Sequence, residues 1–499
     1  MKDKTFTIKA SQITSLKEKW ATLSSRQMEF QWKSIPWKAI EKRVDKLQSR
    51  ITKATVEGKK GLAKKLQHLL TNSFFAKLLA VRKVTTNKGK NTPGIDKCLW
   101  STPTSKLKGA LSLKRKGYNA SPLRRTYIEK KGKKKKRPLG IPTMYDRAMQ
   151  ALHAMALDPI SEATADKVSF GFRKKRSIHD AATHIFRYLW FKNSAQWILE
   201  GDIKGCFDNI NHQWMLNNIP MDKRTLKQFL KAGFIYQKQL FQTKAGTPQG
   251  GIVSPILANM TLDGIEGKIK AKYWTNTRGT IDRDYNKHKV NYTRYADDFI
   301  VTAESKDILL DIKLIIEEHL KQRGLTLSEE KTLITHIEQG FDFLGWNFRK
   351  HKGTLIVKPS KASLKNIQNK IRSTIKSYRT AKQENLIWKL NPIITGWANN
   401  HRRVAAKDAF SKLDNTVFRS LWNWAKRRHS NKPMQWLKDR YWKKTGNRDW
   451  IFNHDKYTLK LATDTKITRH RLIKFDANPY LHTDKLYYTA REKQRKKWN

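Results

Sequence analysis

Cysteine, acidic residues and long apolar runs are all scarce in this chain. Cys98 and Cys206 are its only cysteines among 499 residues, too few for a disulfide framework or a four-cysteine zinc site. No apolar run reaches the 18 residues typical of a membrane helix, and the N-terminus lacks the apolar core of a signal peptide. These absences predict a cytoplasmic protein with no membrane partner.

The shortage of acidic residues leaves a large excess of positive charge. Lys and Arg number 103 against 42 Asp and Glu, a formal net charge of +61. Such a charge binds polyanions strongly, so nucleic acid is the expected partner. Residues 351–499 alone hold 36 basic and 10 acidic residues, together with eight of the 17 tryptophans. Basic side chains interleaved with aromatic ones are typical of a surface that contacts phosphates and stacks on bases.

Two adjacent aspartates interrupt a strand-forming segment. Asp297 and Asp298 lie between Tyr292–Tyr295 and Phe299–Thr302, two runs rich in β-branched and aromatic residues, which predicts a hairpin with the aspartates at its tip. Two like charges there repel each other unless a cation lies between them. A divalent cation such as Mg²⁺ prefers carboxylate oxygens and takes few protein ligands. The alternative interpretation is a solvated acidic turn.

A second carboxylate follows another predicted strand. Trp197–Leu199 leads to Asp202, whose side chain can project from the sheet beside the hairpin tip. Two metal ions bridged by such carboxylates can activate a 3′-hydroxyl and stabilise a pyrophosphate leaving group, which is nucleotidyl transfer. The dense basic run 130–137 would supply cations for a triphosphate. Glycines in Thr247–Gly251 would let the backbone approach a template–primer closely.

The remaining pattern indicates an α+β sheet domain followed by a helical region. A capping box at Thr143–Asp146 begins a helix that we expect to end near Pro159, and Ile308–Gln322 carries a helical apolar stripe. Beyond Pro359 the pattern is helical, with no clear strand until about Thr458.

The order and spacing of these motifs resemble those of the reverse transcriptases, and more narrowly of the group II intron-encoded reverse transcriptases, the intron maturases. The resemblance runs from Asn91 to about Lys444. The segments that carry it are Arg137–Thr143 and Phe170–Arg173 with His179 for the fingers, Asp202–Asp208, Gly246–Leu257 and Tyr295–Asp298 for the palm, Gly324–Thr332 and Phe343–Trp346 for the sixth and seventh motifs, and Pro392–Asn399 with the Trp-rich stretch to Trp442 for the thumb.

The resemblance implies a right-hand polymerase with four parts. We expect a mostly helical N-terminal extension (1–105) and then fingers and palm with an antiparallel sheet (106–358). A helical thumb or maturase domain (359–455) and a basic DNA-binding segment (456–499) would follow.

The resemblance also implies roles for individual residues. The expected metal ligands for two Mg²⁺ ions, with Mn²⁺ as an alternative, are Asp202, Asp297 and Asp298 with the Ile203 carbonyl. Phe207 would exclude a ribose 2′-hydroxyl, Gln249 would line the nascent base pair, Lys130 and Arg137 would hold the triphosphate, and Lys331 would donate a proton to pyrophosphate. The structural alternatives are a core position for Phe207 and a solvated turn for Lys331.

The chain departs from the family pattern in two places. Lys97 stands where glycine is usual in the N-terminal motif, which puts the local turn in doubt. Relatives often end in a His-Asn-His nuclease with paired cysteines. No cysteine follows Cys206, and His454, His470 and His482 are scattered, so we expect this chain to lack the nuclease.

The expected function is that of an RNA-directed DNA polymerase that binds its group II intron RNA, assists splicing as a maturase and supports intron homing by target-primed cDNA synthesis. Its partners would be the intron RNA, target DNA and dNTPs, in a bacterial cytoplasm, and the sequence leaves a homodimer open. One alternative is an RNA-binding splicing cofactor with a vestigial polymerase. Another is a host-recruited reverse transcriptase in DNA repair.

Overall fold

The computed structural model describes residues 18, 20–129 and 136–497. They form two hydrophobic cores: a large one with residues from Met28 to Tyr488, and a smaller one with residues from Ile367 to Ala462. No helix in these ranges is long and apolar enough to cross a bilayer. The combination of antiparallel sheets and helices confirms the predicted α+β class.

Five helices lie near the start of the described chain. The second, third and fourth pack against a long helix, α7 (Met144–Thr164), and the first and fifth pack against each other. The second of them buries Ile40, Val44 and Ile51 at helical spacing. The last one spans residue 105, so the predicted domain boundary falls inside a helix. These helices are α2 (Ser25–Lys33), α3 (Trp37–Val56), α4 (Lys60–Asn72), α5 (Phe74–Thr86) and α6 (Pro103–Ser112).

Helix α7 begins where the capping box predicts, with the Thr143 hydroxyl accepting the Asp146 backbone N–H at 3.1 Å. The prediction that it ends near Pro159 is wrong, because the helix continues to Thr164. Proline removes the N–H that would bond to the carbonyl four residues earlier. Here the Gln48 side chain of α3 donates to that Met155 carbonyl at 2.8 Å. A neighbouring helix therefore satisfies the acceptor, and the helix tolerates its proline.

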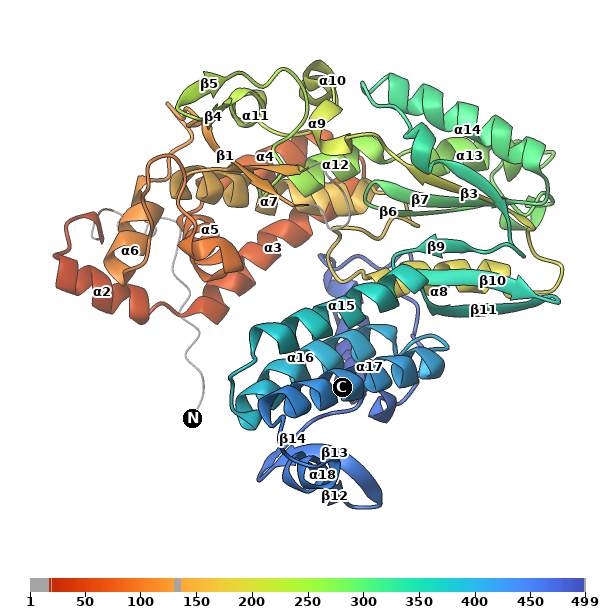
Figure 1. Cartoon of the computed structure of the whole chain (residues 1–499). Coiled ribbons are helices and arrows are strands. Elements are labelled where there is room, and N and C mark those ends of the chain that lie inside the picture. Colours follow the sequence, from red (N-terminus) through yellow and green to blue (C-terminus); the bar gives the residue numbers. More distant parts are fainter. Residues whose placement is uncertain (1–17, 19, 130–135, 498–499) are drawn as a thin grey trace.

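Four antiparallel strands form the central sheet, in the order β6-β7-β3-β8. The strand predicted from Trp197 and the predicted hairpin are both present. Helix α14 follows close to its predicted bounds and packs against β3 and β7. Figure 1 shows α13 and α14 above this sheet. The elements are β3 (Trp197–Asp202), β6 (Asn291–Tyr295), β7 (Asp298–Ala303), β8 (Leu333–His336), α12 (Ser254–Leu262), α13 (Ile265–Tyr273) and α14 (Lys306–Lys321).

A second four-stranded sheet, the outer sheet, has the order β2-β1-β4-β5, with β1 and β4 parallel and the other pairs antiparallel. It and its flanking helices lie beside the central sheet (Figure 1). The elements are β1 (Leu123–Ile128), β2 (Arg137–Ile141), β4 (Phe234–Tyr236), β5 (Gln239–Phe241), α9 (Cys206–Asn209), α10 (His212–Asn218) and α11 (Lys223–Lys231). Helix α8 (Ile178–Leu189) packs instead against β6 of the central sheet.

A three-stranded sheet leads into a bundle of three helices, α15 to α17, which lies below the two sheets in Figure 1. The expectation of no strand before Thr458 is wrong, because a small sheet forms from residue 442. Its strands are short and mostly polar, yet Trp442 and Phe452 are buried in the smaller core. The elements are β9 (Phe341–Phe343), β10 (Trp346–His351), β11 (Thr354–Pro359), α15 (Lys361–Ser377), α16 (Gln383–His401), α17 (Lys407–Arg428), α18 (Met434–Tyr441), β12 (Trp442–Thr445), β13 (Arg448–His454) and β14 (Tyr457–Thr458).

The C-terminal residues are not a separate segment. The predicted boundary between 455 and 456 divides the hairpin of β13 and β14. Further on, Ile473, Ala477 and Tyr488 join the larger core beside the sheets. The chain ends in α19 (Lys485–Lys497). Residues 456–497 therefore connect the helical bundle to the sheet region, which composition alone does not reveal.

Two buried hydrogen-bond acceptors fix this connection. The fully buried Asp180 carboxylate on α8 accepts from the Ile473 backbone N–H at 3.0 Å and from Arg491 at 2.6 Å, and lies 2.9 Å from the His470 ring. On the bundle side, the Arg402 carbonyl accepts the Thr468 N–H at 2.9 Å.

The turn around Lys97 has the backbone that its family position requires. Lys97 adopts φ of +54°, in the left-handed region that glycine occupies without strain. The Asp96 carboxylate accepts the Cys98 N–H at 3.1 Å. The turn therefore forms with lysine in place of glycine.

Candidate active site

The paired aspartates lie at the tight turn between β6 and β7. Tyr295 pairs with Asp298 across the hairpin, so the turn consists of Ala296 and Asp297, and Asp298 is the first residue of β7. Ala296 has φ of +60°, the sign that a II′ turn needs at its first position. A Cβ on Gly171 would collide with the Ala296 backbone. Glycine at 171 therefore lets the neighbouring chain pack directly against the turn.

A buried polar cluster supports this turn from below, and the sequence does not reveal it. Arg294, fully buried on β6, forms an ion pair with Asp263 and donates to the Asn259 side chain at 3.2 Å and to the Ala296 carbonyl at 3.3 Å. Asn259 in turn donates to the Gly171 carbonyl at 2.8 Å. The one available signal is an arginine in a strand whose other residues are uncharged, since a charge buried there demands a buried acid.

The strand β3 brings the third carboxylate to the same place. Asp202 and Asp298 are paired residues of neighbouring antiparallel strands. The preceding pair is Gly201 and Phe299, where the ring occupies the space of a Cβ. Lys331, in a 3₁₀ turn at Glu329–Lys331, forms an ion pair with Asp202. The structure thus brings together Asp202, Asp297, Asp298 and Lys331, which are distant in sequence.

The electrostatics of the cluster favour a bound cation. Exclusion of water, followed by the charges of Asp297 and Asp202, raises the pKa of Asp298 to about 6. Exclusion of water and the Asp202 charge also raise the pKa of Asp297. A positive charge among the three carboxylates would relieve this repulsion. Lys331 supplies one such charge.

The donor set suits Mg²⁺, but it is incomplete by itself. Among the residues that the structure describes, no group of three or more His, Cys, Asp or Glu side chains could hold a metal ion as it stands. Mg²⁺ usually takes one or two protein carboxylates and completes its shell with water and substrate phosphate. The buried Ile203 follows Asp202 directly. The carboxylates therefore fit a metal ion whose shell is completed by water and substrate phosphate, and in this structure the Lys331 ammonium pairs with Asp202.

Beside the carboxylates, aromatic side chains form a partly exposed wall. Phe207 on α9 is half-buried, and its ring meets that of Phe172 edge-on, with centroids 6.2 Å apart. Phe172 is 53 % exposed and has φ of +59°. Phe207 packs against the larger core while part of its ring stays exposed, and Phe172 extends the surface that it offers.

Gln249 joins this wall to the outer sheet. The side-chain amide of Gln249 donates to both carboxylate oxygens of Asp208 at 3.1 Å. The backbone carbonyl of Gln249 accepts the Gly140 N–H of β2 at 2.9 Å. Arg137, the exposed first residue of β2, is close enough for its charge to offset a small part of the rise in the pKa of Asp297. Lys130 lies outside the described residues, so its predicted role stays a prediction.

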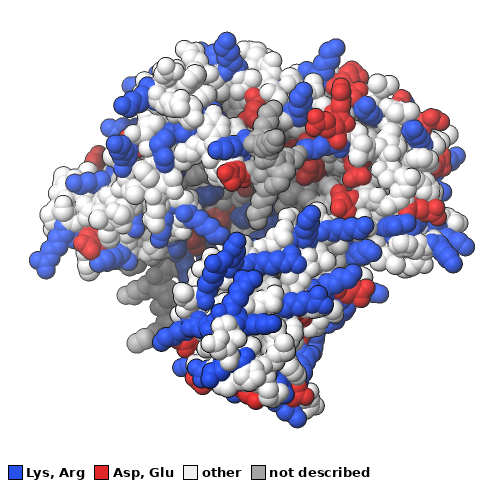
Figure 2. Space-filling view, in the orientation of Figure 1, with Lys and Arg blue, Asp and Glu red and all other residues white. Residues whose placement is uncertain are grey.

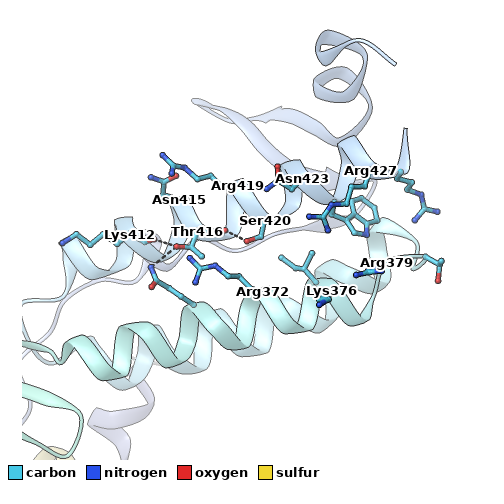
Figure 3. Close-up of a pocket in the computed structure, with 15 residues that line it drawn as sticks. Arg372, Lys376, Arg379, Lys412, Asn415, Thr416, Arg419, Ser420, Asn423 and Arg427 are labelled. Atoms are coloured by element: carbon cyan, nitrogen blue, oxygen red, sulfur yellow. Dashed lines mark hydrogen bonds between the residues drawn. The ribbon is translucent and has the colours of Figure 1, made fainter. Parts of the chain in front are cut away.

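A basic groove runs along the helical bundle between α15 and α17 (Figure 3). It has a volume of about 1340 Å³ and contains no Asp or Glu among its lining residues. Gln368 crosses it and donates to Thr416 at 2.9 Å. The cations that line it are Arg372, Lys376, Arg379, Lys412, Arg419, Arg427 and Arg428. Figure 2 shows Lys and Arg side chains crowded over this part of the molecule.

Family comparisons agree with the geometry. The description "Reverse transcriptase (RNA-dependent DNA polymerase)" matches residues 128–348, which contain the whole central sheet, the outer sheet except for most of β1, and all the predicted site residues. "N-terminal domain of reverse transcriptase" matches residues 32–113, and "Group II intron, maturase-specific domain" matches residues 364–442, most of the helical bundle. Together these matches define a reverse transcriptase with a maturase domain.

Individual relatives agree with this class. The group II intron-encoded protein LtrA of Lactococcus lactis subsp. cremoris is 34% identical over 357 residues, 60% of this chain and 59% of LtrA. Protein YkfC of Escherichia coli is 33% identical over 301 residues, 53% of this chain and 78% of YkfC. A protein in the cob intron of Schizosaccharomyces pombe is 31% identical over 340 residues, 57% of this chain and 41% of that protein. The chain belongs to the family of group II intron-encoded reverse transcriptases and maturases.

Proposed function

We propose that this protein is an RNA-directed DNA polymerase that binds a group II intron RNA, assists its splicing and supports its homing. The observation that carries the proposal is the meeting of Asp202, Asp297 and Asp298 where β3 ends and β7 begins, beside the aromatic wall of Phe207 and Phe172. Reverse transcriptases generally use divalent metal ions. Since the chain spans 59% of LtrA, the activity is a proposal for this chain.

We assign the metal ligands to the three carboxylates and the Ile203 carbonyl, with Mg²⁺ as the metal and Mn²⁺ as the alternative. Bound there, two such ions would polarise the α-phosphate and lower the pKa of the primer 3′-hydroxyl. The chain itself contributes position. The buried Arg294 cluster holds Asp297 at the turn, and the β3–β7 pairing holds Asp202 beside Asp298.

The remaining site residues bind the nucleotide. Phe207 and Phe172 close the sugar pocket against a 2′-hydroxyl, and Gln249, fixed by Asp208, lines the nascent base pair. Arg137 holds the triphosphate. Lys331, which forms an ion pair with Asp202 in this structure, would serve as the proton donor to the departing pyrophosphate. Lys130 would bind the triphosphate together with Arg137.

The basic groove supports the RNA-binding part of the proposal. Seven cations line it without an acidic neighbour, and releasing counterions from the phosphates they contact would favour binding. A splicing cofactor with a vestigial polymerase would need only this groove. Because the carboxylates and Gln249 are present in a coherent arrangement, we favour the active polymerase. Target DNA and dNTPs are the further proposed partners.

The test is primer extension by purified protein on an RNA template, with and without Mg²⁺, followed by splicing of the flanking intron transcript. Asp297→Asn should lower extension at least 1000-fold, about 4 kcal/mol of transition-state stabilisation. Folding and splicing support should persist. Asp284→Asn, an exposed aspartate in a distant loop, is the matched control. Wild-type extension by the Asp297 variant would reject the site assignment, and splicing without any extension would favour the vestigial alternative.

A further inference from the structure

A second groove lies where α8, β10 and β11 meet the chain after α16 and residues 467–472. Its volume is about 990 Å³, and it shares no lining residue with the carboxylate site or the basic groove. Its floor is apolar, with the buried side chains of Trp346, Leu355 and Val357. We call it the aromatic groove.

Three aromatic side chains at the end of α8 remain exposed along this groove. Phe186, Trp190 and Phe191 are 39 %, 53 % and 61 % exposed. The rings of Phe186 and Trp190 are stacked, with centroids 6.4 Å apart and planes 30° apart, and Phe191 lies 5.0 Å from Trp190. A cluster of exposed aromatic rings is costly in water unless a partner covers it. Flat, half-exposed rings in succession offer a stacking surface.

The rim of the groove is cationic. Arg187, Arg283, Arg403 and Arg469 line it, and its lining contains no Asp or Glu. Arg403 is held in place by donating to the Thr468 hydroxyl at 2.7 Å and to the Arg469 carbonyl at 2.9 Å. Arg187, Arg283 and Arg469 are exposed and form no ion pair within the described ranges. Their charge is therefore available to an anion.

We propose that the aromatic groove binds unpaired nucleotides of a nucleic acid strand. Bases would stack on Trp190, Phe186 and Phe191, while phosphates contact Arg187, Arg283 and Arg469. A duplex cannot present base faces to these rings, because its bases are already stacked. A second copy of the chain would bring another strongly basic surface to a basic rim. The site goes beyond the proposed polymerase and does not require it to be active.

The experiment measures binding of a labelled ten-nucleotide single strand after an excess of unlabelled template–primer duplex has filled the polymerase site. Trp190→Ala should weaken binding about 5- to 100-fold, the range for loss of one base–aromatic stack. Trp388→Ala is the matched control, because Trp388 is 69 % exposed on α16 and does not line the groove. Arg187→Gln should reduce the slope of log K against log salt by about 0.7.

Strands of RNA and DNA with the same sequence, and a duplex of the same length, distinguish the ligands. If Trp190→Ala weakens the binding of a single strand, the proposal is supported, whether wild type binds RNA more tightly than DNA or binds both equally. In addition, a 4-thiouridine strand should crosslink to residues 186–191. Equal loss with Trp388→Ala, or a duplex that binds as well as the strand, would overturn it.

Two further measurements separate the remaining outcomes. Sedimentation of wild type and Trp190→Ala tests the copy–copy alternative. A self-association that the variant abolishes, with RNA affinity unchanged, would overturn the proposal. Primer extension should be the same in wild type and Trp190→Ala. An inactive polymerase with intact strand binding would reject the proposed function alone, and an active one with unchanged strand affinity in Trp190→Ala would reject the aromatic groove alone.

Discussion

The central sheet and the helical bundle place charge in opposite ways. In the sheet, three carboxylates meet in a partly buried cluster in which Asp298 is exposed, and a buried Arg294–Asp263 pair supports their turn. In the bundle, seven cations line an open groove above a separate apolar core. Chemistry needs a few charges in fixed positions, whereas phosphate binding needs many charges on an accessible face. Charge in the sheet should therefore be sensitive to single substitutions, and charge in the bundle tolerant of them.

The largest expected effect comes from breaking the buried pair. Arg294→Met leaves Asp263 without its partner and should lower the free energy of unfolding by about 3–5 kcal/mol. Denaturant unfolding measures it. The double variant Arg294→Met with Asp263→Asn removes the orphaned charge and should recover part of the loss. If the single variant is as stable as wild type, the turn does not depend on this cluster.

Acid should weaken the connection between the sheet region and the helical bundle, because protonation of Asp180 weakens its contacts with the C-terminal residues. Burial alone would raise the pKa of Asp180, but the hydrogen bond from His470 and the Arg491 charge outweigh it and lower the pKa to about 2. A lowered folded-state pKa gives stability that is present above the ordinary value near 4 and is lost as pH falls toward 2.

The contribution from Asp180 is about 2 kcal/mol. Asp180→Asn should therefore be less stable at neutral pH and show a shallower loss of stability between pH 4 and pH 2. Chemical denaturation at several pH values measures both slopes. Parallel slopes for the variant and wild type would contradict the assignment.

A smaller effect is expected at the sugar pocket. Phe207→Ala opens the partly exposed wall and should raise ribonucleotide use relative to deoxyribonucleotide use about 10- to 100-fold. Steady-state kinetics with each nucleotide measure the ratio. Phe30→Ala, at an N-terminal phenylalanine that is 73 % exposed, controls for loss of an aromatic ring. An unchanged ratio in Phe207→Ala would remove Phe207 from the pocket.

The smallest effect on stability is expected in the basic groove. Arg419→Gln should change the free energy of unfolding by less than about 0.5 kcal/mol, because Arg419 lines an open groove whose described lining residues include no acid. It should, however, lower the salt slope of RNA binding by about 1. Filter binding at several salt concentrations measures this slope. A large loss of stability in Arg419→Gln would show that the bundle, like the sheet, depends on single charges for its folding.

The sequence predicted much of the chemistry because the relevant signals are local. Charge excess, the run before Pro138 and the order of motifs are read directly from the chain. The α+β class and the family were predicted correctly. The strand patterns around Asp202, Asp297 and Asp298 predicted that these carboxylates lie close together, and the strand pairing brings them together. Their role as metal ligands stays a prediction. The hairpin differs in one detail, since Ala296 and Asp297 form its turn.

Tertiary structure decided what depends on contacts between distant residues. Helix α7 passes through Pro159 because Gln48 satisfies the Met155 carbonyl. The residues after 455 join both cores, although their composition resembles a free basic tail. The sequence does not show which acid pairs with Arg294 or which segments form the aromatic groove, because burial of a charge and exposure of a ring are set by neighbours that are distant in the chain. Local pattern fixes which groups a chain carries, and packing fixes which of them meet water.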